Sequence, residues 1–174
     1  MTRLLLALLI AVPPAFGAIG YSGFKHPRGD YSLEYPSDWK RTVGVETVSL
    51  RPPGKKGDRV RLTLERRPVG KEEAPTAASY VSALAKDPLK KVESRAAVTV
   101  AGLPAERLAL VETAELYGKH GQAFDGPLRE AVVVLPQKEG YFVVRLAGVG
   151  EEFAKALPEF DRLVSGLKLN PPKK

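Results

Sequence analysis

Basic side chains are concentrated between residues 51 and 71, where they form a dense group of residues able to bind anions. The group consists of Arg51, Lys55, Lys56, Arg59, Arg61, Arg66, Arg67 and Lys71. Guanidinium and ammonium groups hold carboxylates and phosphates through charge-assisted hydrogen bonds. Arg59 and Arg61 alternate with apolar residues, which predicts that both lie on the outward face of a strand, with Lys55 and Lys56 on the adjoining turn. These four residues form a candidate face for an anionic partner, and a solvated edge protected against strand pairing is the alternative.

The two histidines, His26 and His120, lie in glycine-rich segments, and the chain has no cysteine. A zinc site would need further ligands at matched spacing, so we interpret both as surface-loop residues and predict no metal. Lys119, His120 and Gln122 belong to a polar, glycine-rich stretch, 118–126. This stretch is a candidate contact loop, because long loops often carry binding residues, and a plain hairpin tip is the alternative.

The chain carries no recognisable catalytic constellation. A Gly-x-Ser-x-Gly elbow is absent, and Gly148-Val149-Gly150 lacks the third glycine of a dinucleotide fingerprint because Phe153 stands at that position. The acidic residues are dispersed without an acid–base pattern, and no aromatic residues alternate with the basic ones to stack on nucleic-acid bases. We therefore predict a protein that is not an enzyme, holds no cofactor and binds no specific nucleic acid.

Several strands must position these residues. Tyr31, Leu33 and Tyr35 alternate with polar residues, Pro36 ends that strand, and Trp39 follows as the only tryptophan. The stretch 40–51 predicts a strand with a kink or tight turn near 44–47, and 59–66, 90–100 and 105–117 predict further strands. The β-rich runs 128–135 and 141–147 predict a central antiparallel hairpin.

Two helical regions complete the pattern. Residues 75–86 predict a helix with Thr76 as its N-cap. Residues 151–164 predict a second helical region, in which Pro158 should introduce a kink and restart a short helix. Strands, a helix, strands and a helix pair, joined by mostly short connections, favour an α+β sandwich with an antiparallel sheet.

Length, charge and the N-terminus limit the function. The chain has 174 residues and a net charge of +7, which fits one domain and favours anionic partners. A single arginine, an apolar run over 4–12 and the small residues Ala15 and Gly17 predict a signal peptide, residues 1–17, and hence an exported, periplasmic or secreted protein. An uncleaved N-terminal membrane anchor is the alternative, although the run is too short to span a bilayer. Residues 18–29 are glycine-rich and predict a flexible lead-in.

Three segments carry a resemblance to a known group of proteins. They are the aromatic strand with its proline and tryptophan (31–39), a strand–turn–strand (98–107), and a short helix with a final strand (160–169). In order and spacing they resemble the Mog1/PsbP-like fold, in particular the bacterial secreted proteins similar to the PsbP and DcrB families. The resemblance implies an αβα sandwich, with one domain over 30–170 and a tail over 171–174. These families are mostly scaffolds and binding proteins, so the resemblance implies no chemistry.

Two functional hypotheses follow. The first is an exported, non-enzymatic binding or accessory module for an envelope protein or an acidic surface. The second is a small-ligand carrier with an apolar cavity between the sheet and the helices. A closed, filled core beneath Tyr80, Leu84, Phe153 and Phe160 would count against the carrier.

Overall fold

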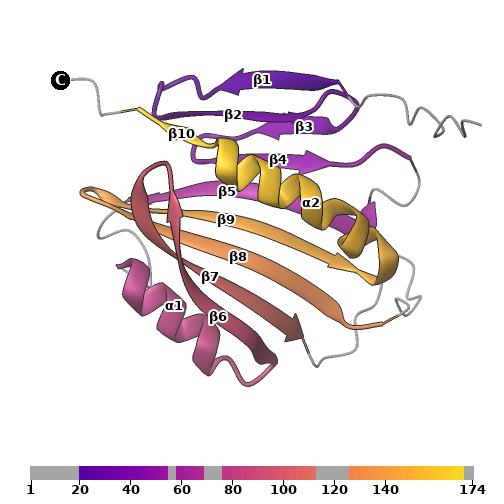
Figure 1. Ribbon diagram of the computed structural model, residues 1–174, viewed down its shortest axis with the longest axis vertical. Helices are drawn as coiled ribbons and strands as arrows, with labels where there is room; N and C mark the ends of the chain where they lie inside the picture. The colour runs from indigo at the N-terminus through magenta and orange to yellow at the C-terminus, as the bar shows by residue number, and fades with distance from the viewer. Residues whose placement is uncertain (1–19, 55–57, 69–75, 113–125, 171–174) are drawn as a thin grey trace, which may run out of the picture.

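The computed structural model of the chain describes residues 20–54, 58–68, 76–112 and 126–170. The elements in these ranges are β1 (Tyr21–Lys25), β2 (Tyr31–Pro36), β3 (Lys40–Val43), β4 (Thr47–Arg51), β5 (Val60–Pro68), α1 (Ala77–Lys86), β6 (Lys90–Val100), β7 (Leu103–Glu112), β8 (Leu128–Gln137), β9 (Gly140–Val149), α2 (Gly150–Gly166) and β10 (Lys168–Leu169). Their order is the predicted one of strands, a helix, strands and a C-terminal helical region (Figure 1). The predicted signal peptide, residues 1–17, and the tail, 171–174, lie outside the described residues.

The main sheet is antiparallel throughout, with the strand order β3-β4-β5-β9-β8-β7-β6. The predicted central hairpin is confirmed, because β8 and β9 pair along their full length from Leu128 opposite Val149 to Gln137 opposite Gly140. Both strands are largely apolar on both faces, as expected of strands that are covered from two sides.

Alternate residues of β8 point into two separate cores. Val132 and Val134 lie in a core with Tyr80 of α1, whereas Val133 lies in the other core with Phe160 of α2. The two helices therefore cover opposite faces of the sheet, and α2 crosses the strands diagonally in Figure 1. This arrangement confirms the predicted α+β sandwich.

Helix α1 begins where the sequence predicts. The Thr76 hydroxyl accepts a hydrogen bond from the Ser79 backbone N–H at 3.1 Å, and the Ser79 hydroxyl oxygen accepts one from the Thr76 N–H at 3.0 Å. This capping box satisfies two donors that the first turn of a helix leaves without partners. Tyr80, Val81 and Leu84 form its buried face.

The prediction that Pro158 divides the C-terminal helical region is wrong. α2 runs without interruption from Gly150 to Gly166, with Pro158 inside it. The proline removes one backbone hydrogen bond, but Phe153, Phe160 and Leu163 bury the same face on both sides of it, and this packing outweighs the local loss. Neither described helix is long and apolar enough to cross a membrane.

The prediction of a flexible lead-in over residues 18–29 is also wrong, because β1 forms within it. β1 and β10 pair with the two edges of β2 and make a three-stranded antiparallel sheet. A short strand with an internal glycine is stabilised here by backbone pairing with β2. Tyr31, Leu33 and Tyr35 are buried as predicted, and their side chains pack with α2 and one face of the main sheet, while Trp39 is partly buried against this core.

Candidate functional site

The candidate anionic-partner face lies on the main sheet, on the side away from α2. Val60, Leu62 and Leu64 point into the α2 core, so the alternating Arg61 and Thr63 point to the other side, and Arg61 is exposed as predicted. Strand register adds neighbours to the same side. We call this surface the open basic face, formed by Lys40, Thr42, Ser49, Arg51, Arg61 and Thr63. Because α1 packs mainly on β6 and β8, neither described helix covers it.

The remaining predicted site residues have different surroundings. Arg59 is half-buried and has an interaction of its own within the chain. Arg51 pairs with Asp58 at 2.9 Å on the surface. Lys55 and Lys56, and the predicted contact-loop residues Lys119, His120 and Gln122, lie outside the described residues.

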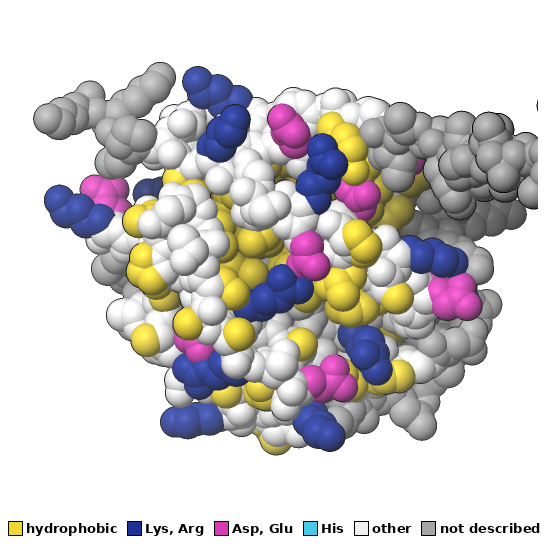
Figure 2. All heavy atoms as spheres, viewed as in Figure 1, with side chains coloured by type: hydrophobic (Ala, Val, Ile, Leu, Met, Phe, Trp, Pro, Cys, Tyr) yellow, Lys and Arg dark blue, Asp and Glu magenta, His cyan; other side chains and the backbone are white. Residues whose placement is uncertain are grey.

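The basic stretch does not form one continuous patch. Arg66 shares the face of Leu62 and Leu64, so it points toward the three-stranded sheet rather than to the open basic face. Arg67 pairs with Glu65 at 3.1 Å and lies over the ring of Tyr80, 4.7 Å from its centroid. The face that carries α2 likewise shows charges of both signs with apolar atoms between them (Figure 2).

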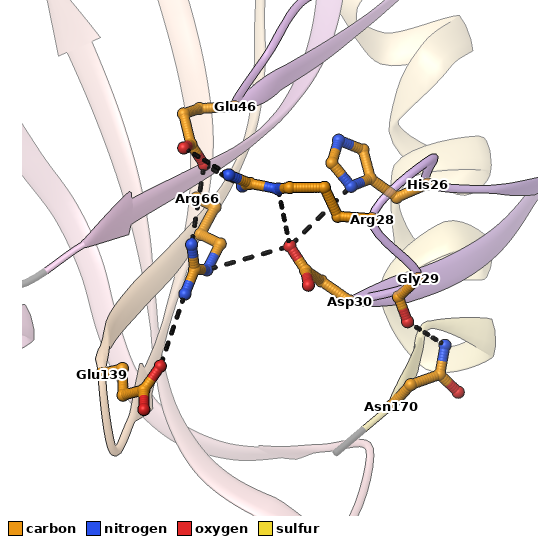
Figure 3. Close-up of polar contacts among 8 residues, drawn as sticks. All are labelled: His26, Arg28, Gly29, Asp30, Glu46, Arg66, Glu139 and Asn170. Atoms are coloured by element: carbon orange, nitrogen blue, oxygen red, sulfur yellow. Dashed lines mark hydrogen bonds and ion pairs between the residues drawn. The ribbon is translucent and has the colours of Figure 1, made fainter. Parts of the chain in front are cut away.

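Arg66 takes part in a polar cluster that the sequence analysis missed. The cluster joins the two sheets and consists of His26, Arg28, Asp30, Glu46, Arg66 and Glu139, which we call the junction cluster (Figure 3). Arg66 nitrogens lie 4.0 Å from Asp30, 3.9 Å from Glu46 and 3.9 Å from Glu139. Arg28 Nη1 donates to Glu46 at 2.8 Å, and Arg28 Nε lies 3.3 Å from Asp30 Oδ2. Opposite charges therefore alternate through the cluster, in which two guanidinium groups lie among three carboxylates.

His26 is not the surface-loop residue that the sequence predicts. Its side chain is 3 % exposed and stacks on Tyr31, with 4.8 Å between ring centroids. The chain reverses between β1 and β2 through the bond from Gly29 N–H to the His26 carbonyl oxygen, which turns the imidazole inward beside the aromatic residues of β2. His26 Nδ1 lies 3.8 Å from Asp30 Oδ2, too far for a hydrogen bond.

The electrostatics of the junction cluster indicate a structural role. The hydrogen bonds from Arg28 hold the pKa of Glu46 below its usual value, and the same bonds raise the pKa of Arg28. Burial, followed by the negative charge of Asp30, raises the pKa of the Tyr31 hydroxyl. These pKa shifts all favour the state in which the Glu46 carboxylate and the Arg28 guanidinium are charged and the Tyr31 phenol is neutral.

A small cleft of about 140 Å³ opens beside the cluster. Its lining is formed by Asp30, Arg66, Gln137, Lys138, Glu139, Tyr141, Phe142, Leu169 and Asn170. This size suits a few water molecules or one very small ligand, and it is below the usual range for drug-sized ligands.

A second polar group lies on the α1 side of the sheet. Glu130 is 4 % exposed and is contacted by Lys90 Nζ at 3.1 Å and by Arg145 Nη1 at 3.4 Å. Arg145 also donates to the Tyr80 hydroxyl at 2.5 Å, which ties α1 to the sheet. Within the described ranges, no group of three or more metal-ligating side chains is arranged to hold an ion.

Comparison with known proteins identifies the fold but no family. No family model matches the chain, and no curated protein is detectably similar in sequence. Among solved structures, it is similar to cyanobacterial PsbP (CyanoP) from Synechocystis, with a TM-score of 0.58 and 11 % identity over 92 % of this chain and 99 % of that one. The Ran-binding protein Mog1p of Saccharomyces cerevisiae gives a TM-score of 0.52 and 8 % identity, over 87 % and 96 % of the two chains. LpqN of Mycobacterium tuberculosis, described as involved in cell envelope biogenesis, gives a TM-score of 0.50 and 15 % identity, over 87 % of this chain and 91 % of LpqN. The chain has a Mog1/PsbP-like fold, as the sequence resemblance implied.

Proposed function

We propose that this chain is a non-catalytic binding or accessory module of the cell envelope, which holds an acidic partner protein on the open basic face. The observation that carries the proposal is the exposure of Arg61 on a sheet surface that neither described helix covers. Lys40 lies directly opposite Arg51 in the register, and Ser49 lies opposite Thr63. The face thus combines cations with hydroxyl groups able to donate hydrogen bonds to carboxylates.

The distribution of charge supports this assignment. The junction cluster holds three carboxylates and two guanidinium groups, and the group around Glu130 holds one carboxylate and two cations, so the two groups together add nothing to the net charge of +7. The excess positive charge must therefore lie largely elsewhere. A positive field of this kind raises the association rate with acidic partners.

The fold neighbours and the N-terminal sequence motivate the rest of the proposal. One neighbour is a Ran-binding protein and another is involved in cell envelope biogenesis. The apolar run over 4–12 with small residues after it supports export, and the proposal therefore places the partner in the envelope.

The carrier alternative finds less support. Tyr80 and Leu84 are buried in the α1 core, and Phe153 and Phe160 in the α2 core, so large side chains fill the space directly beneath these positions, while a groove of about 480 Å³ opens beside them between α1, β6 and β7. A carrier for an apolar ligand needs unfilled volume at these positions.

Capture of partners from envelope extract of the source organism tests the proposal. The immobilised chain should retain an acidic protein at both low and moderate salt, and Arg61→Glu should abolish retention. Lys168→Glu makes the same charge change at an exposed position on the three-stranded sheet and should leave retention intact. Retention at low salt alone, or equal retention by Arg61→Glu, would refute the proposal, because non-specific charge contacts are screened by salt.

A further inference from the structure

A groove of about 330 Å³ runs along the other side of the molecule, between the turn after β2, the segment after β4 and helix α2. We call it the Trp39 groove. Its lining consists of Pro36, Asp38, Trp39, Pro52, Pro53, Val60, Glu152, Lys155, Ala156 and Glu159. Val60 and Ala156 belong to the α2 core, so the groove and the open basic face lie on opposite faces of the main sheet.

The apolar part of the groove offers few hydrogen-bond donors. Pro36, Pro52 and Pro53 have fixed φ angles and no backbone N–H. Trp39 packs against the core on one side, and its indole N–H donates to no acceptor among the described residues. An indole that is partly buried in this way presents a flat apolar face together with one donor.

The rim of the groove is acidic although the whole chain is basic. Asp38, Glu152 and Glu159 contribute three carboxylates against the single ammonium of Lys155. Lys155 Nζ already pairs at 2.9 Å with Glu151, which is not part of the lining. The Tyr21 hydroxyl donates to both oxygens of Glu159, at 3.0 and 3.2 Å, and this fixes the position of that carboxylate.

We propose that the Trp39 groove binds an extended, proline-containing segment of a partner protein that carries lysine or arginine beside its prolines. Proline rings pack on a flat indole, and an adjacent carbonyl of the segment accepts the Trp39 N–H. Such segments adopt the polyproline II conformation before binding, so they lose little entropy, and aromatic-lined grooves commonly recognise them. The basic side chains pair with the carboxylates of the rim.

This inference does not rest on the proposed function. The open basic face selects an acidic surface, whereas the Trp39 groove selects a basic segment on the opposite side of the sheet. The Arg61→Glu variant tests the first site and leaves the second unchanged, so either proposal can fail alone.

The only tryptophan of the chain reports directly on the groove. The whole chain is titrated with a capped nine-residue peptide of three Pro-Pro-Lys repeats, and Trp39 fluorescence is recorded. We expect a saturable change, even though the peptide and the chain both carry net positive charge. Two control peptides replace every lysine by glutamate or every proline by alanine, and each should bind at least about tenfold more weakly, a difference of one or two good contacts. Absence of a saturable change, or equal binding of either control peptide, would overturn the proposal.

Variants assign the binding to the groove. Anisotropy of a labelled Pro-Pro-Lys peptide avoids dependence on the tryptophan signal. The double variant Asp38→Asn/Glu159→Gln should weaken binding about fivefold or more, because it removes two of three rim carboxylates. Glu34→Gln changes one exposed carboxylate on β2 away from the lining and should bind like the unmodified chain. Trp39→Phe, with folding verified by thermal melting, should also bind more weakly because it loses the indole donor. Unchanged affinity of both the double variant and Trp39→Phe would exclude the groove.

Discussion

Glu130 is a buried carboxylate whose negative charge is compensated by two cations. Removing the cations one at a time should therefore lower the free energy of unfolding in steps. Lys90 approaches it from β6 and Arg145 from β9, at 3.1 and 3.4 Å. The perturbation is replacement of each cation by methionine, singly and together, since methionine retains an unbranched apolar stem. Glu130→Leu is then added to the double variant.

The expected magnitudes follow from the contacts. Either single replacement leaves one cation beside the carboxylate, so the free energy of unfolding should fall by about 1–2 kcal/mol. Arg145→Met should lie at the upper end, because it also removes the donor to the Tyr80 hydroxyl. The double replacement leaves an uncompensated buried charge and should cost about 3–5 kcal/mol. Adding Glu130→Leu removes that charge and should recover most of the loss.

Urea denaturation at 25 °C, followed by far-UV circular dichroism, measures these free energies. Lys91→Met is the matched control, because Lys91 is an exposed neighbour on the same strand and its replacement should change stability by less than about 0.5 kcal/mol. The reasoning is refuted if the double replacement costs less than about 1 kcal/mol, or if the triple variant is no more stable than the double.

Three further outcomes are expected. Phe160→Ala removes a fully buried ring beneath α2 and should lower the free energy of unfolding by about 3–5 kcal/mol in the same urea assay, and a smaller loss would contradict the filled core. Pro158→Ala restores a helical N–H at an exposed position and should stabilise the chain by about 1–3 kcal/mol; a neutral or lower melting temperature would contradict an uninterrupted α2. Because Arg28 lowers the pKa of Glu46, this carboxylate stabilises the fold above its unfolded pKa, and that contribution is lost as the pH falls through the lower folded pKa. Glu46→Gln should therefore flatten the acid limb of the stability–pH curve by less than about 1 kcal/mol, since the pair is partly exposed, and an unchanged acid limb would count against the pairing.

Periodicity along the chain predicted much of the fold because burial on a strand depends on residue parity. In the stretch 59–66 the apolar residues are the even-numbered ones, which correctly placed Arg61 on the outward side. The same parity puts Arg66 on the side of Leu64, and this signal was present in the sequence. The sequence analysis treated the basic residues as one group because they are close along the chain. It did not separate them by strand face, and the junction cluster was therefore missed.

Other features depend on strand pairing and tertiary packing that residue periodicity does not indicate. Tyr21–Lys25 is a strand because β2 supplies its partners, and its own residues alternate only weakly. His26 is buried because the turn at Gly29 folds it against Tyr31, which glycine content alone cannot indicate. Pro158 is tolerated because an apolar stripe continues on both sides of it, so tertiary packing overrides a local helix breaker.

The two proposed surfaces lie on opposite faces of the main sheet, and β5 contributes a residue to each. This geometry limits how the two surfaces can influence one another. Val60 contributes to the Trp39 groove, and the next residue, Arg61, points out of the opposite face of the sheet. Partners on the two faces would therefore be a sheet thickness apart and would not collide. β5 is paired on both edges, with β4 and β9, which makes it a poor candidate for a switching element. Occupation of one surface should then leave the affinity of the other unchanged, because coupling between sites requires an element with two alternative states. A module of this kind would bring two partners together by independent binding, without an allosteric transition.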